Sequence, residues 1–355
     1  MVILDCIHKN FEKIEKEYKD KKILLYGAGV FFEELYKEID FSKLNIIAIA
    51  DKKFQNNTKD KFYNFSCYSP NEIPSLDFDI LLTTVINPDV LRTFLKDITK
   101  NKNIIIKDIV PKSYKWIKYV KDNYNINLTC PDEAYQIIPE IFYHKTYELK
   151  NYIDLKEHIV IDMGMNRGYA SLYFAHNNLC KKVYGFEPCK KTYNTALEQF
   201  NLNPDLKEKI IPHNFGISNE DKEAEIFNYV DYDFLSTTNE TFRIKRPELY
   251  KSEVIKEKII LKNSKDIVEN IFRENNTNYD YILKIDIEGS EYEVLPQLQK
   301  SGLLSKFKII IGEFHKIYTP QKARNLYEYM LLSGQRPIYI SERPGTIVFL
   351  FAIPD

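Results

Sequence analysis

The sequence predicts an α/β protein made of two doubly wound domains, the second of which ends in an antiparallel hairpin. Short apolar runs alternate with amphipathic helical stretches in both halves of the 355-residue chain, as in parallel sheets. Turns that contain glycine follow the first strand of each half, at residues 27–29 and 164–168. Acidic residues close several strands, and such strand ends form the ligand-binding edge of an open sheet.

The first domain is expected over residues 1–115. A charged amphipathic helix is predicted at 11–21. Strands are expected at 23–26, 45–50, 65–68, 79–84 and 104–109, and helices at 30–39 and 88–99. The turn at 27–29 lacks the third glycine of the dinucleotide fingerprint. This domain therefore serves either for dimerisation or for binding the nucleotide half of a substrate. Asp51 is either a ribose ligand or a solvated residue at a strand end.

Residues 116–150 are predicted to form a helical connector. This stretch is aromatic and shows no strand alternation. His144, Lys145 and Tyr147 could border a cofactor pocket, although core or surface roles are favoured for them.

The second domain is expected over residues 151–355. An apolar strand at 158–161 leads into Asp162, and Gly164 and Gly168 then bracket a tight turn before a helix. The remaining strands are expected at 182–186, 209–213, 224–229, 254–261, 281–287 and 307–311. Helices are expected at 190–200 and 321–332, and another begins at residue 290. The hairpin is expected at 337–340 and 346–351.

The glycine turn and the next strand end predict an adenosine site. Glu187 is placed to accept hydrogen bonds from both ribose hydroxyls. The turn does not supply G-x-G-x-x-G, and the order D-x-G-x-x-x-G favours a ligand with an amine and no pyrophosphate. S-adenosylmethionine fits, with its methionine end near Asp162 and its adenine near Asn214, for which loop capping is the alternative. The residues expected to bind this cofactor are Asp162, Gly164, Asn166, Gly168, Glu187, Asn214 and Asp286.

Acids and a histidine at the later strand ends predict a catalytic centre. Asp286 and Glu288 face the same side while their strand lasts, whereas Glu291 is interpreted as a helix cap. We expect His315 to act as a general base in its neutral form, helped by Asp286 and Glu288, and Asp286 and Glu313 could instead orient it. Alternatively, Asp286, Glu313 and His315 hold Mg²⁺, Mn²⁺ or Fe²⁺. A hydrogen bond to the hairpin loop is the structural role left open for His315.

A polar insertion at residues 231–253 is a candidate lid over the substrate. A lid that touches a phosphorylated or nucleotide-linked substrate would use hydroxyl and guanidinium groups. The candidates are Ser236, Thr237, Arg243 and Arg246. A solvated polar loop is the alternative.

Composition excludes several other classes. A formal net charge of −1 provides no field to recruit nucleic acid or an anionic membrane. Five scattered cysteines form neither a zinc nor a disulfide framework, which suits a reducing cytoplasm. No apolar run approaches the roughly 20 residues of a membrane span, and the first residues do not form a signal peptide. We therefore expect a cytoplasmic protein.

The motifs DMGMNRG, GFEP, NFGIS, STT, KIDIEGSEYEVL and GEFH occur in the order seen in FkbM-type methyltransferases. Residues 151–355 thus resemble that family, most specifically at KIDIEGSEYEVL. The resemblance implies a class I methyltransferase-like Rossmann sheet and O-methylation of sugar or polyketide hydroxyls, with S-adenosylmethionine as donor. The first domain resembles small Rossmann-like modules of bacterial sugar-modifying enzymes.

The favoured hypothesis is a homodimeric sugar O-methyltransferase acting on a nucleotide-linked or polymer-bound sugar, such as a GDP-heptose, in capsule or other surface glycan assembly. An NAD(P)-dependent oxidoreductase would need a Tyr-x-x-x-Lys pair near the first sheet, and YKEID and YNFSC offer none. A catalytically dead scaffold would have lost acids, yet Asp162, Glu187 and Asp286 are present. Methylation of nucleic-acid amines would need a D/N-P-P-Y/F motif, which the chain lacks.

Overall fold

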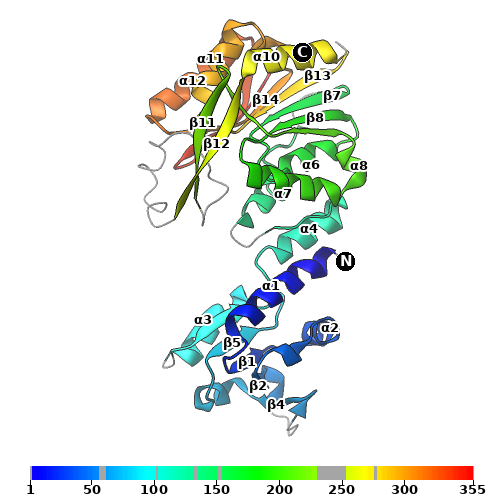
Figure 1. Ribbon diagram of the computed structural model, residues 1–355, viewed down its shortest axis with the longest axis vertical. Helices are drawn as coiled ribbons and strands as arrows, with labels where there is room; N and C mark the ends of the chain where they lie inside the picture. The colour runs from blue at the N-terminus through cyan, green and yellow to red at the C-terminus, as the bar shows by residue number, and fades with distance from the viewer. Residues whose placement is uncertain are drawn as a thin grey trace. The chain divides into compact units, whose positions relative to one another are not determined.

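The computed structural model describes residues 2–55, 61–100, 103–130, 134–149, 154–229, 253–275 and 278–354. The chain divides into two compact units. Unit 1 comprises Met1–Asn123 and Thr129–Tyr135, and unit 2 comprises Tyr124–Leu128 and Gln136–Asp355. Each unit is built on a mainly parallel sheet, which confirms the predicted fold class (Figure 1). The stretch predicted as a connector is split, with α4 (Tyr114–Tyr124) mostly in unit 1 and α5 (Ile137–Phe142) in unit 2.

Unit 1 contains a six-stranded sheet in the order β3-β4-β2-β1-β5-β6, parallel except for the β3–β4 pair. The strands are β1 (Ile23–Tyr26), β2 (Ile46–Ala50), β3 (Lys61–Phe62), β4 (Phe65–Tyr68), β5 (Ile80–Thr83) and β6 (Ile105–Asp108). The helices are α1 (Val2–Tyr18), α2 (Val30–Glu38) and α3 (Asp89–Thr99), with short 3₁₀ turns at Phe41–Lys43, Lys52–Phe54 and Pro70–Ser75. Helix α1 begins earlier than predicted because its buried stripe already includes Ile7 and continues through Phe11 and Ile14.

Unit 2 contains a seven-stranded sheet in the order β15-β16-β14-β13-β7-β8-β9. The strands are β7 (His158–Met163), β8 (Cys180–Phe186), β9 (Ile210–His213), β13 (Asp280–Ile285), β14 (Ile309–His315), β15 (Arg336–Glu342) and β16 (Thr346–Ala352). The first five are parallel, and β16 and β15 close the sheet as the predicted antiparallel hairpin. The ends of β8, β7, β13 and β14 thus lie next to one another at one edge.

The helices of unit 2 cover both faces of this sheet. Besides α5, the described helices are α6 (Tyr169–Ala175), α7 (Lys190–Asn201), α8 (Pro204–Lys207), α10 (Ser264–Glu274), α11 (Glu291–Lys300) and α12 (Pro320–Leu332), with a 3₁₀ turn at Leu304–Lys306. Alternate residues Ile159, Ile161 and Met163 of β7 join the main core with α10, α11 and α12. Helices α6 and α7 lie on the opposite face (Figure 1). The two-residue period of β7 therefore turns Asp162 toward α6.

A separate three-stranded sheet in the order β10-β12-β11 stands beside the main sheet. Its strands are β10 (Gly216–Ser218), β11 (Lys222–Tyr229) and β12 (Val254–Asn263). The short strand β10 pairs with the far end of β12 and is not among the predicted elements. Within the described parts of the chain, no helix combines the length and apolar character needed to cross a membrane.

Candidate active site

A glycine turn joins β7 to α6 at the carboxyl edge of the sheet. Gly164 has a φ of +86°, and a Cβ on it would lie 1.8 Å from the carbonyl oxygen of Asp286. Only glycine permits such a close approach of the turn to the end of β13. Gly168 precedes α6 with a φ of +79°, and a Cβ on it would lie 2.5 Å from the ring of Phe200. The two glycines therefore fix the spacing between the turn and its neighbours.

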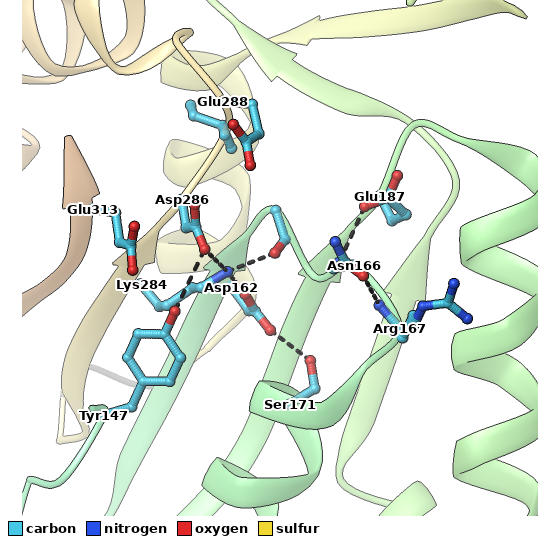
Figure 2. Close-up of polar contacts among 12 residues, drawn as sticks. Tyr147, Asp162, Asn166, Arg167, Ser171, Glu187, Lys284, Asp286, Glu288 and Glu313 are labelled. Carbon is cyan, nitrogen blue, oxygen red and sulfur yellow. Dashed lines mark hydrogen bonds and ion pairs between the residues drawn. The ribbon is translucent and has the colours of Figure 1, made fainter. Parts of the chain in front are cut away.

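Lys284 on β13 is a buried cation that ties this turn to two carboxylates (Figure 2). Its Nζ lies 3.1 Å from Oδ1 of Asp162 and 3.8 Å from Oδ2 of Asp286, and it donates a 2.5 Å hydrogen bond to the carbonyl of Gly164. Ser171 donates to the other oxygen of Asp162 at 2.6 Å. Asp162 is fully buried, and its carboxylate contacts Lys284 and Ser171 and so holds the turn. Its place near the methionine end of the cofactor stays a prediction.

The charge of Lys284 is set by these neighbours. Burial lowers the pKa of the ammonium, but Asp162 and Asp286 outweigh burial and raise the pKa above its ordinary value. Lys284 is absent from the predicted site residues. A signal was present, because a lysine inside the apolar run YILKI needs a buried counter-charge.

Glu187 follows β8 and is almost fully buried. Its Oε2 accepts a hydrogen bond from the backbone N–H of Asn166 at 3.0 Å, and its Oε1 accepts one from Cys189 at 2.9 Å. Burial raises the pKa of Glu187 to about 7, although the two N–H donors oppose this shift. Each carboxylate oxygen has a second lone pair, so hydroxyl groups can still donate to it.

Two asparagines shape the loops around Glu187. Asn166 has a φ of +51°, and its Oδ1 accepts the N–H of Arg167 at 2.7 Å (Figure 2). The Nδ2 of Asn214 donates to the carbonyls of Glu187 at 2.9 Å and Pro188 at 3.1 Å. The amide nitrogen of Asn214 therefore holds the loop after β8, which was the alternative to an adenine contact.

His315, the last residue of β14, lies among three carboxylates. Its Nδ1 is 2.9 Å from Oε1 of Glu291. Its Nε2 is 3.2 Å from Oε2 of Glu288 and 3.8 Å from Oδ1 of Asp286. Asp286 and Glu288 lie in the segment that joins β13 to α11, where Glu288 has a left-handed φ of +51°, and Glu291 is the first residue of α11. Glu291 is fully buried, so its interpretation as a helix cap alone is incomplete.

The three carboxylates control the charge of His315. Burial lowers the pKa of the imidazole, but Glu288, Glu291 and Asp286 outweigh burial and raise the pKa well above its ordinary value. The three carboxylates therefore favour the imidazolium form of the ring, which has no lone pair to accept a proton. This arrangement disfavours the neutral form in which His315 is predicted to act as general base, and that role stays a prediction.

A metal ion could be held by Asp286, Glu288 and His315, because one ligand atom from each lies within 4.8 Å of the others. The predicted set had Glu313 in place of Glu288. The left-handed turn at Glu288 brings its carboxylate to the imidazole, which explains the difference. Glu313 instead lies 3.9 Å from Nη1 of Arg343. Burial, followed by the charge of Asp286, raises the pKa of Glu313 to about 7.

Unit 2 also contains a cavity of about 390 Å³. The turn after α5 and the β15–β16 hairpin line it, with His144, Lys145, Thr146, Tyr339, Arg343 and Val348 among the lining residues. Val348 is opposite Glu313 in the antiparallel β14–β16 register, and opposed residues share a face of the sheet. Tyr147 is buried next to this lining, and its hydroxyl donates to Oδ2 of Asp286 at 3.5 Å (Figure 2). The cavity is therefore lined from the sheet face that carries Glu313, and Tyr147 connects the end of its lining to Asp286.

Other predicted residues lie away from the cluster of Asp286, Glu288 and His315. In unit 1, Asp51 accepts the N–H groups of Ala28 at 2.7 Å and of Lys53 at 2.9 Å. Asp51 thus holds the turn at 27–29. Its role as a ribose ligand, and dimerisation or nucleotide binding by unit 1, stay predictions. The lid candidates fall outside the described residues, namely Ser236, Thr237, Arg243 and Arg246.

The doubly wound sheet of unit 2, its closing hairpin and its carboxylate-lined edge define a class I methyltransferase-like domain. Residues 162–336 match the family model of the methyltransferase FkbM domain. Residues 19–106 match the C2185-like N-terminal domain. The predicted family resemblance is confirmed.

The solved structures to which this chain is similar include methyltransferases, at TM-scores below 0.5. The crystal structure of methyltransferase FkbM from Methylobacillus flagellatus KT has 14% identity and a TM-score of 0.39, with 99% of this chain and 98% of that chain covered. Precorrin-6y C5,15-methyltransferase from Geobacter metallireducens GS-15 has 10% identity and a TM-score of 0.33, with coverages of 61% and 88%. M. capricolum TrmK in complex with S-adenosyl-homocysteine has 15% identity and a TM-score of 0.31, with coverages of 55% and 62%. Among curated proteins no match is found.

Proposed function

We propose that the protein transfers a methyl group from S-adenosylmethionine to a sugar hydroxyl, on a nucleotide-linked sugar or a glycan. The FkbM match makes unit 2 a methyltransferase domain, and the donor and acceptor are our proposal. One observation carries it. The glycine turn and Glu187 lie on two strands of one sheet edge, and Asp286, Glu313 and the cavity follow on the next strands.

The cofactor would bind across the ends of β7 and β8. Glu187 would accept hydrogen bonds from the ribose hydroxyls with its remaining lone pairs. Gly164 and Gly168 would support the ligand indirectly, because they let the turn approach Asp286 and Phe200 and so set the backbone that faces the ligand. Asp162 and Asn214 would act indirectly, by holding the turn and the loop after β8.

The acceptor would enter through the cavity that is lined from the sheet face carrying Glu313. Its hydroxyl oxygen attacks the methyl carbon of the sulfonium, the carbon–sulfur bond breaks, and S-adenosylhomocysteine leaves. Holding the two reactants in line contributes several kcal/mol. Glu313 would take the hydroxyl proton, because a buried carboxylate with a pKa of about 7 is suited to a base near neutral pH.

Asp286, Glu288 and His315 also fit a divalent cation such as Mg²⁺, Mn²⁺ or Fe²⁺. Two carboxylates and one imidazole are donors that these ions accept. Asp286, Glu288 and His315 would hold the ion, with His315 deprotonated. When bound, the ion would act as a Lewis acid that favours loss of the acceptor proton.

Binding of S-adenosylhomocysteine is expected to weaken by roughly tenfold between about pH 7.5 and pH 6. The ribose hydroxyls donate to the charged form of Glu187, and the pKa of that group is raised to about 7. As the pH falls through this value, the carboxylate gains a proton and loses acceptor capacity, so affinity falls. Calorimetric titration at both pH values measures the effect and tests the proposed cofactor directly.

Two variants of Glu187 complete this experiment. Glu187→Gln has no titrating group at this position and should bind weakly, with the same affinity at both pH values. Glu187→Ala should bind little or no S-adenosylhomocysteine. A wild-type protein that binds none, or whose affinity does not change with pH, would contradict the proposed site.

Replacement of Arg343 by Ala is expected to raise KM for the acceptor by about 10–100-fold, the value of one charge-assisted hydrogen bond. Arg343 lines the cavity and pairs with Glu140 and, at 3.9 Å, with Glu313. Its guanidinium is therefore placed to contact an acceptor that reaches Glu313. Initial rates at saturating S-adenosylmethionine measure the change. The matched control is Arg324→Ala, because Arg324 is an exposed arginine bonded to Glu342. Equal KM values in the two variants would remove Arg343 from the acceptor site.

A further inference from the structure

Glu291 is buried more deeply than a helix cap requires. It is the first residue of α11, and its Oε1 accepts the N–H of Ile287 at 3.1 Å, as a capping acid would. Its side chain is nevertheless fully buried. A carboxylate loses several kcal/mol of solvation on burial unless charged or polar partners compensate. Glu293 in the same turn is about half exposed and already places a negative charge near this helix end. Capping alone therefore does not explain Glu291.

The partner that explains its burial is the ring of His315. Oε1 of Glu291 lies 2.9 Å from Nδ1 of His315. The next residue of α11 holds the same histidine by its backbone, since the hydroxyl of Tyr292 donates to the carbonyl oxygen of His315 at 2.8 Å. The first turn of α11 thus contacts His315 at both the ring and the main chain.

These two contacts determine which ring nitrogen of His315 faces Asp286 and Glu288. With Nδ1 hydrogen-bonded to Glu291, the opposite nitrogen Nε2 points toward Glu288 at 3.2 Å and Asp286 at 3.8 Å. A carboxylate behind a histidine commonly fixes both the orientation of the ring and the nitrogen that carries hydrogen. Without Glu291, rotation of the ring would no longer be opposed at Nδ1.

We propose that Glu291 is a positioning residue that fixes the Nδ1–H form of His315 and directs Nε2 toward Asp286 and Glu288. The proposal rests on the proposed function, because it makes Nε2 the nitrogen available to a divalent cation. Glu291 itself touches no reacting atom in this account.

The first test examines the ring without any metal. Histidine labelled with ¹⁵N in the ring gives separate Nδ1 and Nε2 signals, and His315→Asn identifies those of His315. We expect Glu291→Gln to change the Nδ1–H signal of His315, and Glu293→Gln to leave it unchanged. Glu293 is the matched control, because it occupies the same turn and bonds Ser218 at 2.9 Å, not the histidine. Identical His315 spectra for wild type and Glu291→Gln would overturn the proposal.

The second test uses Mn²⁺ alone as probe. Electron paramagnetic resonance counts free Mn²⁺, and we expect Glu291→Gln to lose about 10–100-fold in Mn²⁺ affinity. Glu291→Asp should keep more affinity than Glu291→Gln. Thermal unfolding of each variant shows whether the fold is retained. If wild type binds no Mn²⁺, the metal part of the proposed function fails, and the ring spectra then decide the proposal by themselves. Wild-type Mn²⁺ affinity in Glu291→Gln would overturn it.

Discussion

Glu313→Gln is expected to lower kcat for methyl transfer by roughly 10²–10⁴-fold, the usual contribution of a general base. The substitution keeps the shape of the side chain but removes the carboxylate, whose pKa burial and Asp286 raise to about 7. The affinity for S-adenosylhomocysteine should stay within about twofold, because Glu187 lies three strands away in the sheet order. Single-turnover transfer of a labelled methyl group measures the chemical step without product release.

The matched control is Glu342→Gln. Glu342 is an exposed glutamate on the neighbouring hairpin that bonds Arg324 at 2.7 Å and does not approach Asp286. Glu342→Gln removes the same charge from the same end of the sheet but no proposed proton acceptor, so kcat should change little. If Glu313→Gln turns over as fast as Glu342→Gln, another group takes the proton and the assigned role of Glu313 is wrong.

The fold could be predicted because its signals are local. The apolar run of β7 and the glycine turn after it are contiguous in the sequence, and the structure has both at the predicted place. The early start of α1 and the short strand β10 could not be predicted with the same ease. The strand β10 exists because it pairs with β12, more than forty residues later in the chain, and no local pattern reports such a partner.

The identities of the site residues could be predicted better than their charges. Asp286 directly follows β13 and His315 ends β14, whereas Glu288 is placed by the left-handed turn after β13. The protonation of His315 depends on how many carboxylates surround the ring, which the packing of α11 against β14 decides. Glu291 shows the same limit, since a first-turn acid is read locally as a cap. Lys284 is found only when its buried partners are known.

Lys284→Met is expected to destabilise unit 2 by about 3–5 kcal/mol, the cost of removing one member of a buried ion pair. The ammonium contacts Asp162 at 3.1 Å, Asp286 at 3.8 Å and the carbonyl of Gly164 at 2.5 Å. Methionine fills similar space but leaves Asp162 buried with only Ser171 as a donor. The glycine turn should also become more mobile, because it loses the hydrogen bond from Lys284 to the carbonyl of Gly164. Hydrogen exchange of the β7 and β13 amides measures this loss within unit 2.

The control for volume and charge is Lys300→Met, because Lys300 is exposed at the end of α11. The single tryptophan, Trp116, belongs to unit 1, so its fluorescence reports whether that unit stays folded in each variant. The double variant Asp162→Asn with Lys284→Met should recover part of the loss, since the unpaired charge is then absent. Equal protection in Lys284→Met and Lys300→Met would show that the buried lysine does not hold the turn, and the cofactor site would need another support.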